Sequence, residues 1–228
     1  MFESPRAAFG AGARIIAPIL LGALPFGMVV GAVSAEVGLS FVQSMAMGVI
    51  VFAGTAQLVS LELLNANAII WVIVLSAFMV NLRHMIYSAS LSRHLKPLSA
   101  AWKLLLSYLL IDQIYALTIA HYDAYPDEPY KQWYHFGMAV PIWWTWMAAT
   151  AIGFFVGAII PSSWSLTFVI PLMFLALLVP AIKGLPYFAA ALVSAIVVLL
   201  AIDLPNNLGF ILATFSGIAT GTLLERVK

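Results

Sequence analysis

Two opposite charges stand deep inside long apolar runs of this sequence. Arg83 lies in the run 67–91, and Asp112 lies in the run 100–121 that follows it. A guanidinium group binds carboxylates, whereas a carboxylate binds ammonium groups or exchanges protons. An arginine at the centre of a bilayer costs at least ~2.5–3.5 kcal/mol on insertion scales, so it is expected to have a partner and a function. We therefore take Arg83 and Asp112 as the first candidates for chemistry.

The depths expected for the two charges in the membrane predict that they pair. Arg83 is ten residues before Arg93, and Asp112 is nine residues after Lys103. If the two later basic residues mark the membrane surface, a rise of about 1.5 Å per residue puts Arg83 roughly 15 Å deep and Asp112 roughly 13–14 Å deep. The spacing predicts an ion pair between adjacent helices. Such a pair either handles solute or protons directly or only fixes the register of the two helices.

Other polar side chains flank the pair. Asn81 is a candidate for substrate binding beside Arg83, and Tyr87 lies one helical turn from Arg83 on the same face. His84 either relays protons near neutral pH or donates a hydrogen bond to a nearby carbonyl. The candidates for proton or ammonium handling also include the phenols at i−4 and i+3 from Asp112, which share its face on a continuous helix: Tyr108 and Tyr115.

A third group of polar residues interrupts the apolar run 39–64. Gly54, Thr55 and Gln57 stand in its middle. A helix broken at Gly54 would leave free amide groups and the positive end of a half-helix dipole, which suits a substrate carboxylate. The alternative is a glycine kink with Thr55 bonded back to its own helix. In the run 13–35, Pro25 and Gly27 are candidate helix hinges because both residue types mark kinks in membrane helices.

Composition sets the class of protein. Hydrophobic residues form 64% of the 228 residues, charged residues form 8%, and the mean hydropathy is +1.05. A soluble domain has about 25% charged residues, so the bilayer must act as the solvent for this chain. The absence of cysteine excludes disulfides and thiolate chemistry, and the four scattered histidines form no metal-binding pattern. We predict no cofactor and no metal.

Hydropathy predicts an all-α polytopic integral membrane protein, with residues 1–228 as one membrane domain. Arg6 and Arg14 precede an uncleaved first helix. Short linkers separate eight apolar segments, which span residues 13–35, 39–64, 67–91, 100–121, 135–160, 164–182, 185–203 and 206–224. The five tryptophans around segment five (Trp133, Trp143, Trp144, Trp146 and Trp164) are read mostly as residues of the interfacial aromatic belt.

Charge sets the expected topology. Arg6 and Arg14, the basic group 93–103, and Lys183 with the basic C-terminus should all be cytoplasmic, and the acidic linker 122–131 should face out. Eight plain crossings do not satisfy this arrangement. Segment two, interrupted at Gly54, and segment six, which contains Pro171 and Pro180, are the best candidates for broken or re-entrant segments. The alternative is that both cross as kinked helices and break the charge rule.

A faint internal similarity favours two inverted repeats, 13–121 and 135–224. Residues 27–32 (GMVVGA) resemble residues 153–158 (GFFVGA), and the predicted topology runs segments one and five in opposite directions. Each half would then hold three crossings and one broken segment, as in many transporters. The alternative is ordinary helix packing, because small residues four apart are common at membrane helix contacts.

Two stretches of the sequence resemble motifs of the AzlC family, the large subunits of bacterial branched-chain amino-acid exporters. They are Phe52-Ala53-Gly54-Thr55-Ala56-Gln57-Leu58 and Asn81-Leu82-Arg83-His84, the latter followed by Tyr87-Ser88-Ala89-Ser90-Leu91. Pro25-Phe26-Gly27 and Asp112-Gln113 with Tyr115-Ala116-Leu117 occur in the order of the family, although the position after Asp112 is often acidic there. The resemblance implies export of leucine, isoleucine, valine and methionine, driven by the proton-motive force. It also implies a small AzlD-type membrane partner.

The sequence therefore predicts a secondary transporter in the bacterial inner membrane, with both termini in the cytoplasm. Solute carboxylate would meet Arg83 and the break at Gly54, while Asp112 would meet the ammonium group or exchange a proton. The alternative is a channel-like or scaffold subunit whose partner determines the solute. A membrane enzyme is disfavoured because the sequence shows no clustered metal ligands and no nucleophile–base pair.

Overall fold

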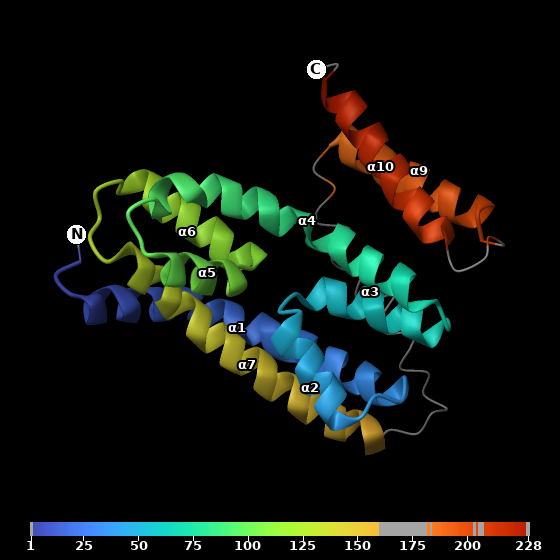
Figure 1. Cartoon of the computed structure of the whole chain (residues 1–228), viewed down its shortest axis with the longest axis horizontal. Coiled ribbons are helices and arrows are strands. Elements are labelled where there is room, and N and C mark those ends of the chain that lie inside the picture. Colours follow the sequence, from blue (N-terminus) through green and yellow to red (C-terminus); the bar gives the residue numbers. More distant parts are fainter. Residues whose placement is uncertain (1, 160–181, 183, 203, 205–207, 227–228) are drawn as a thin grey trace. The chain divides into compact units, whose positions relative to one another are not determined.

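The computed structural model describes residues 2–159, 182, 184–202, 204 and 208–226. Within these residues the regular structure is entirely α-helical, as predicted for a polytopic membrane protein (Figure 1). The helices are α1 (Pro5–Glu36), α2 (Phe41–Ile50), α3 (Gly54–Asn65), α4 (Ile70–Leu95), α5 (Ala100–Tyr108), α6 (Asp112–Ala124), α7 (Lys131–Ile159), α9 (Leu185–Leu200) and α10 (Leu208–Arg226).

Four of these helices, α1, α4, α7 and α10, are long and apolar enough to cross a membrane. They correspond to the predicted segments one, three, five and eight. The chain divides into two compact units, residues 1–57 with 80–161 and residues 58–79 with 162–228. The first unit contains all the predicted site residues.

Helices α1 and α7 lie side by side and run parallel (Figure 1). A Cβ atom added at Gly12 would meet Tyr134, one at Gly27 would meet Ala149, and one at Gly31 would meet Thr150. Because the contacts advance together along both helices, the prediction that segments one and five run in opposite directions is wrong. Residues 27–32 and 153–158 are packing partners rather than inverted copies, so their similarity is explained by the small residues that close helix contacts require.

The predicted break in segment two is present. Helix α2 begins with a capping box, in which Ser40 and Gln43 bond each other's backbone amides, and it ends at Ile50. Residues 51–53 are not helical, and α3 begins at Gly54. The prediction is thus confirmed, with the break lying just before Gly54 rather than at Gly54 itself. Segment six, the other predicted broken segment, lies outside the described residues.

Segment four is also broken, which the sequence prediction of one crossing missed. Helix α5 ends at Tyr108 and α6 begins at Asp112, so Leu109–Ile111 form the tip of a helical hairpin (Figure 1). His135 on α7 contacts the backbone of Leu106 before the tip and the hydroxyl of Thr118 after it, at 3.5 Å. In one continuous helix Leu106 and Thr118 would lie about 18 Å apart, so contact of both with a single side chain requires that the chain turns back. Segment four therefore enters and leaves the unit at the same end.

The basic residues before segment four and the acidic linker after it lie at that same end of the unit. The Phe2 amide donates to Glu128, Arg93 and His94 contact the Asp123 carboxylate at 2.8 and 3.0 Å, and the Trp102 ring lies 5.1 Å from that of Trp133. The prediction that the acidic linker lies opposite the basic groups at residues 6 and 93–103 is therefore wrong. Because the turn in segment four was not predicted, the directions expected for the later segments were reversed.

The second unit contains the antiparallel pair α9 and α10. The Ser194 hydroxyl donates to the Ala213 carbonyl at 3.0 Å, and Gly209 and Gly217 lie against α9. An open groove of about 540 Å³ runs along the pair, with Ala190 and Gly221 among its lining residues. The small residues thus let the two helices pack closely.

Candidate functional site

Arg83 connects the helices that follow the two breaks. Its Nη1 lies 2.8 Å from Oδ2 of Asp112, the first residue of α6, and its Nη2 donates to Thr55 Oγ1 at 2.5 Å in the first turn of α3. The predicted ion pair between adjacent segments is therefore present. The guanidinium suits this position because its planar fork presents several donors in fixed directions.

Several polar atoms in this group are buried without a hydrogen-bond partner among the described residues. They are Arg83 Nε, Asp112 Oδ1, Asn81 Oδ1 and Gln57 Nε2. Buried polar atoms are nearly always satisfied, and each unsatisfied one requires an explanation. Here two are donors and two are acceptors. A ligand that carries both an anionic and a cationic group would satisfy both kinds.

The two helix starts add positive potential to the same place. The first amides of a helix lack intrahelical partners and carry about half a positive charge in total. The residue before α6 is Ile111, whose side chain cannot accept a hydrogen bond, and Asp112 supplies the negative charge in the first turn. Residues 51–53 precede α3 with buried, apolar Phe52 and Ala53. Arg83 and the two helix starts together outweigh the single negative charge of Asp112.

Aromatic side chains surround Asp112 on the side of α4. The rings of Tyr87 and Tyr115 stack with centroids 4.2 Å apart, and Tyr115 donates to the Ser90 hydroxyl at 3.2 Å. Tyr87 and His84 both lie within electrostatic range of Asp112 and Arg83. The structure therefore brings Tyr87, Tyr115 and His84 together near the Arg83–Asp112 pair, and their part in proton or ammonium handling stays a prediction.

Tyr108 does not share a helix face with Asp112, contrary to the i−4 prediction. It ends α5, and the tip of the hairpin separates it from α6. Its hydroxyl donates to the Val49 carbonyl at 2.6 Å and accepts from Trp143 Nε1 at 3.1 Å. Residues four apart share a face only within one helix, and here the helix ends between Tyr108 and Asp112.

Phe26 and Trp146 form an aromatic wall against the start of α3. Trp146 Nε1 donates to Gln57 Oε1 at 3.1 Å in a buried contact, and the rings of Phe26 and Trp146 meet edge to face at 5.3 Å. A Cβ atom added at Gly54 would lie less than 3.0 Å from both rings. Trp146 is thus a site neighbour rather than a belt residue. Its sequence signal is weak, because nothing distinguishes it from Trp143 or Trp144.

The candidate hinge residues lie in a continuous helix. Helix α1 passes through Pro25 without ending, and Gly27 is buried against Ala149 of α7. Gly27 therefore has a packing role in this conformation, and a hinge role for both residues stays a prediction.

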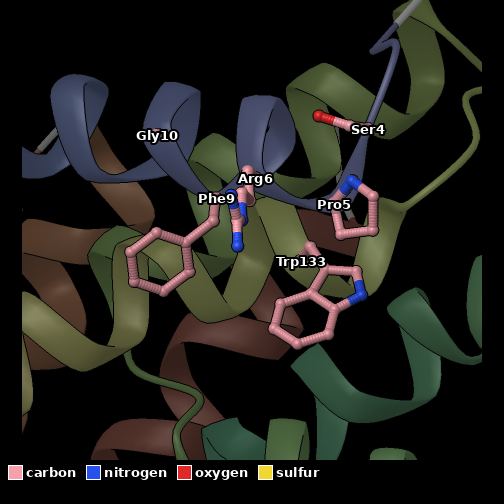
Figure 2. Close-up of a pocket in the computed structure, with 6 residues that line it drawn as sticks. All are labelled: Ser4, Pro5, Arg6, Phe9, Gly10 and Trp133. Atoms are coloured by element: carbon pink, nitrogen blue, oxygen red, sulfur yellow. The ribbon is translucent and has the colours of Figure 1, made fainter.

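A separate cavity of about 610 Å³ lies at the start of α1 (Figure 2). Arg6, Phe9 and Trp133 are the larger residues that line it, with Ser4, Pro5 and Gly10. Arginine and tryptophan are typical of the membrane interface. None of the predicted site residues lines this cavity, so we treat it as distinct from the candidate site.

Comparisons with known proteins agree with this picture. The chain is 26% identical over 230 residues to the inner membrane protein YgaZ of Escherichia coli, covering 97% of this chain and 91% of that protein. It is 28% identical to an uncharacterized membrane protein of Archaeoglobus fulgidus, with 94% of each chain covered. A membrane protein of Helicobacter pylori is 32% identical over 100 residues, 43% of each chain.

No solved structure matches the chain. The model of the AzlC protein family matches residues 18–160, a range that includes the break before Gly54, the Arg83–Asp112 ion pair and the aromatic wall. Together with the membrane-protein relatives, this match indicates a role in membrane transport. The chain belongs to the AzlC family.

Proposed function

We propose that this protein is a secondary transporter that exports the branched-chain amino acids leucine, isoleucine and valine, and also methionine. The observation that carries the proposal is the Arg83–Asp112 ion pair, in which Arg83 Nε and Asp112 Oδ1 are both buried and unpartnered among the described residues. A free amino acid is a zwitterion, so its two charged groups match one donor and one acceptor side by side.

In this proposal the solute carboxylate binds Arg83 and the positive start of α3. Thr55, which already accepts from Arg83 Nη2, orients the guanidinium. Gln57 and Asn81 add one donor and one acceptor. Asp112 meets the solute ammonium group or exchanges a proton, with His84, Tyr87 and Tyr115 around it. The aliphatic side chain packs against apolar residues such as Phe26 and Phe52.

The proposed setting is the inner membrane, with the N-terminus in the cytoplasm. The end of the first unit that holds the N-terminus also holds Arg93 and the linker before Trp102, and the positive-inside rule counts these basic residues while acidic ones contribute little. Transport follows alternating access and uses the proton-motive force. A small AzlD-type membrane subunit is the proposed partner, as the resemblance implies.

Uptake of labelled leucine into inverted membrane vesicles tests the proposed function. Vesicles that contain the chain with the small subunit should accumulate leucine when a proton gradient is imposed, and a protonophore should abolish the accumulation. Vesicles with the chain alone show whether the partner is needed. The proposal fails if none of leucine, isoleucine, valine and methionine accumulates above the level of vesicles that lack the chain.

Thr55→Val is expected to raise the KM for leucine about ten-fold with little change in the amount of folded protein. The substitution keeps the shape of the side chain but removes the acceptor of Arg83 Nη2, and an unsatisfied buried donor costs about 1–3 kcal/mol. Thr222→Val is the matched control, because the Thr222 hydroxyl bonds only to carbonyls of its own helix in the described structure. Equal KM values for the two variants would show that Thr55 does not orient Arg83.

A further inference from the structure

We propose that Tyr108 is a positioning residue for the transport site: its hydroxyl holds the tip of the α5–α6 hairpin against the end of α2 and thereby keeps Asp112 beside Arg83. The inference rests on the proposed function only in taking Arg83 and Asp112 as the solute site. It assigns Tyr108 a role different from contact with solute or proton.

The first observation is the acceptor that Tyr108 satisfies. Val49 lies in the last turn of α2, where helix carbonyls have no intrahelical partner. The Tyr108 hydroxyl donates to this carbonyl at 2.6 Å, and Trp143 Nε1 donates to the same hydroxyl at 3.1 Å. The hydroxyl thus links α5 to the broken end of α2 and to α7. A phenylalanine would leave the carbonyl at the break without this donor.

The second observation is that polar contacts hold both flanks of the hairpin tip. Tyr108 is the last residue of α5 and contacts Val49, while Asp112 is the first residue of α6 and contacts Arg83. Between them Leu109 and Leu110 are 5% and 3% exposed. Because only three residues separate Tyr108 from Asp112 and two of these are buried, a displacement of Tyr108 also displaces Asp112.

The third observation is that Tyr108 also contacts the broken part of segment two through its ring. The Phe52 ring lies 6.3 Å from the Tyr108 ring, and Phe52 stands two residues before the start of α3. Tyr108, which ends the helix before the second break, therefore contacts the chain before and within the first break, whereas Arg83 contacts it just after both breaks. The two contacts together fix the position of the broken segments around the site.

Cysteine labelling tests this role, because the chain contains no native cysteine. A Leu110→Cys variant reports exposure of the tip to a water-soluble thiol reagent, and an Ala116→Cys variant on the exposed side of α6 serves as its reference. Tyr108→Phe should raise the labelling rate at position 110 about five-fold, because it removes about one net hydrogen bond that holds the tip in place. The labelling rate at position 116 should not change. Tyr125→Phe, a change of an exposed tyrosine in the linker, should change neither rate.

Transport provides the second measurement. Tyr108→Phe should raise the KM for leucine about five-fold and leave the maximal rate within about two-fold, because the site remains intact once the tip is seated. Should Tyr108→Phe not reach the membrane, Trp143→Phe removes one of the two contacts of the hydroxyl and should raise labelling at position 110 about two-fold.

Unchanged labelling at position 110, or an equal rise at positions 110 and 116, would overturn the positioning role. The second of these results would show a general loosening of the protein. A rise confined to position 110 without any change in KM would also overturn it, since the tip would then move without affecting the site. If the unmodified chain together with the small subunit transports no amino acid, the proposed function fails, while labelling still decides whether Tyr108 holds the tip.

Discussion

Arg83→Lys should lower the initial rate of proton-driven leucine uptake about 30-fold while the protein remains folded. A lysine is a single compact donor and cannot contact Asp112 and Thr55 together as the guanidinium does. Arg83 and Asp112 are 33% and 41% exposed, so the lost contact is placed at the lower end of the range of about 2–5 kcal/mol for hydrogen-bonded charge pairs, and about 2 kcal/mol corresponds to a factor of about 30. The measurement is uptake into inverted vesicles, normalised to the amount of folded protein.

The chain offers a matched control for this substitution. Arg93 forms an ion pair with Asp123 at the same distance of 2.8 Å, but its side chain is 62% exposed against 33% for Arg83. Exposed ion pairs contribute about 0–1 kcal/mol, so Arg93→Lys should leave uptake within about two-fold of the unmodified protein. If Arg83→Lys and Arg93→Lys transport equally well, Arg83 has no part in the site.

Gly31→Ala should lower the apparent melting temperature of the detergent-solubilised protein by about 2–12 °C. The added Cβ would lie less than 3.0 Å from the Thr150 carbonyl and the Phe154 amide, which are backbone atoms of α7 and cannot move alone. Overpacking costs about 1–3 kcal/mol, and each kcal/mol shifts the melting temperature by about 2–4 °C for a protein of this size.

Gly22→Ala on the same helix is the control for this prediction. A Cβ added at Gly22 meets no described atom within 4 Å, and alanine favours a helix over glycine by about 1 kcal/mol. Its melting temperature should therefore stay the same or rise slightly. A fall of equal size in both variants would show that contact with α7 is not what makes Gly31 sensitive.

The pairing of Arg83 with Asp112 and the break in segment two could be predicted from the sequence for physical reasons. A charged side chain is so unfavourable in hydrocarbon that two opposite charges at equal depth are expected to form an ion pair. Gly54 followed by polar Thr55 and Gln57 interrupts an apolar run where little else does. In both cases the cause lies in the residues themselves. The local sequence was therefore enough to predict the ion pair and the break in segment two.

The hairpin of α5 and α6 could not be predicted in this way. Its tip consists of Leu109, Leu110 and Ile111, which a helix accommodates well, and neither proline nor glycine marks the turn. The turn is stabilised by contacts distant in sequence, such as the Tyr108 hydroxyl with Val49 and His135 with both arms. A signal was present in Asp112, since an acidic residue suits the first turn of a helix.

The missed turn in segment four explains the errors in topology and in the helix face assigned to Tyr108. With segment four taken as a crossing, α7 was expected to run against α1, and the acidic linker was expected at the opposite end from Arg93. The structure instead has Phe2 beside Glu128 and Arg93 beside Asp123. Tyr108 was assigned to the face of Asp112 for the same reason. Tertiary contacts decided each of these features.

Binding of labelled leucine to the purified protein tests the central claim most directly, because it depends on neither the coupling ion nor the direction of transport. Arg83→Ala and Asp112→Ala should each weaken leucine binding at least about 30-fold, because each leaves one charge of the site unpaired. Arg93→Ala and Asp123→Ala, which remove the exposed ion pair, should bind leucine as the unmodified protein does. Unchanged leucine binding by folded Arg83→Ala and Asp112→Ala would contradict the claim that this ion pair is the solute site.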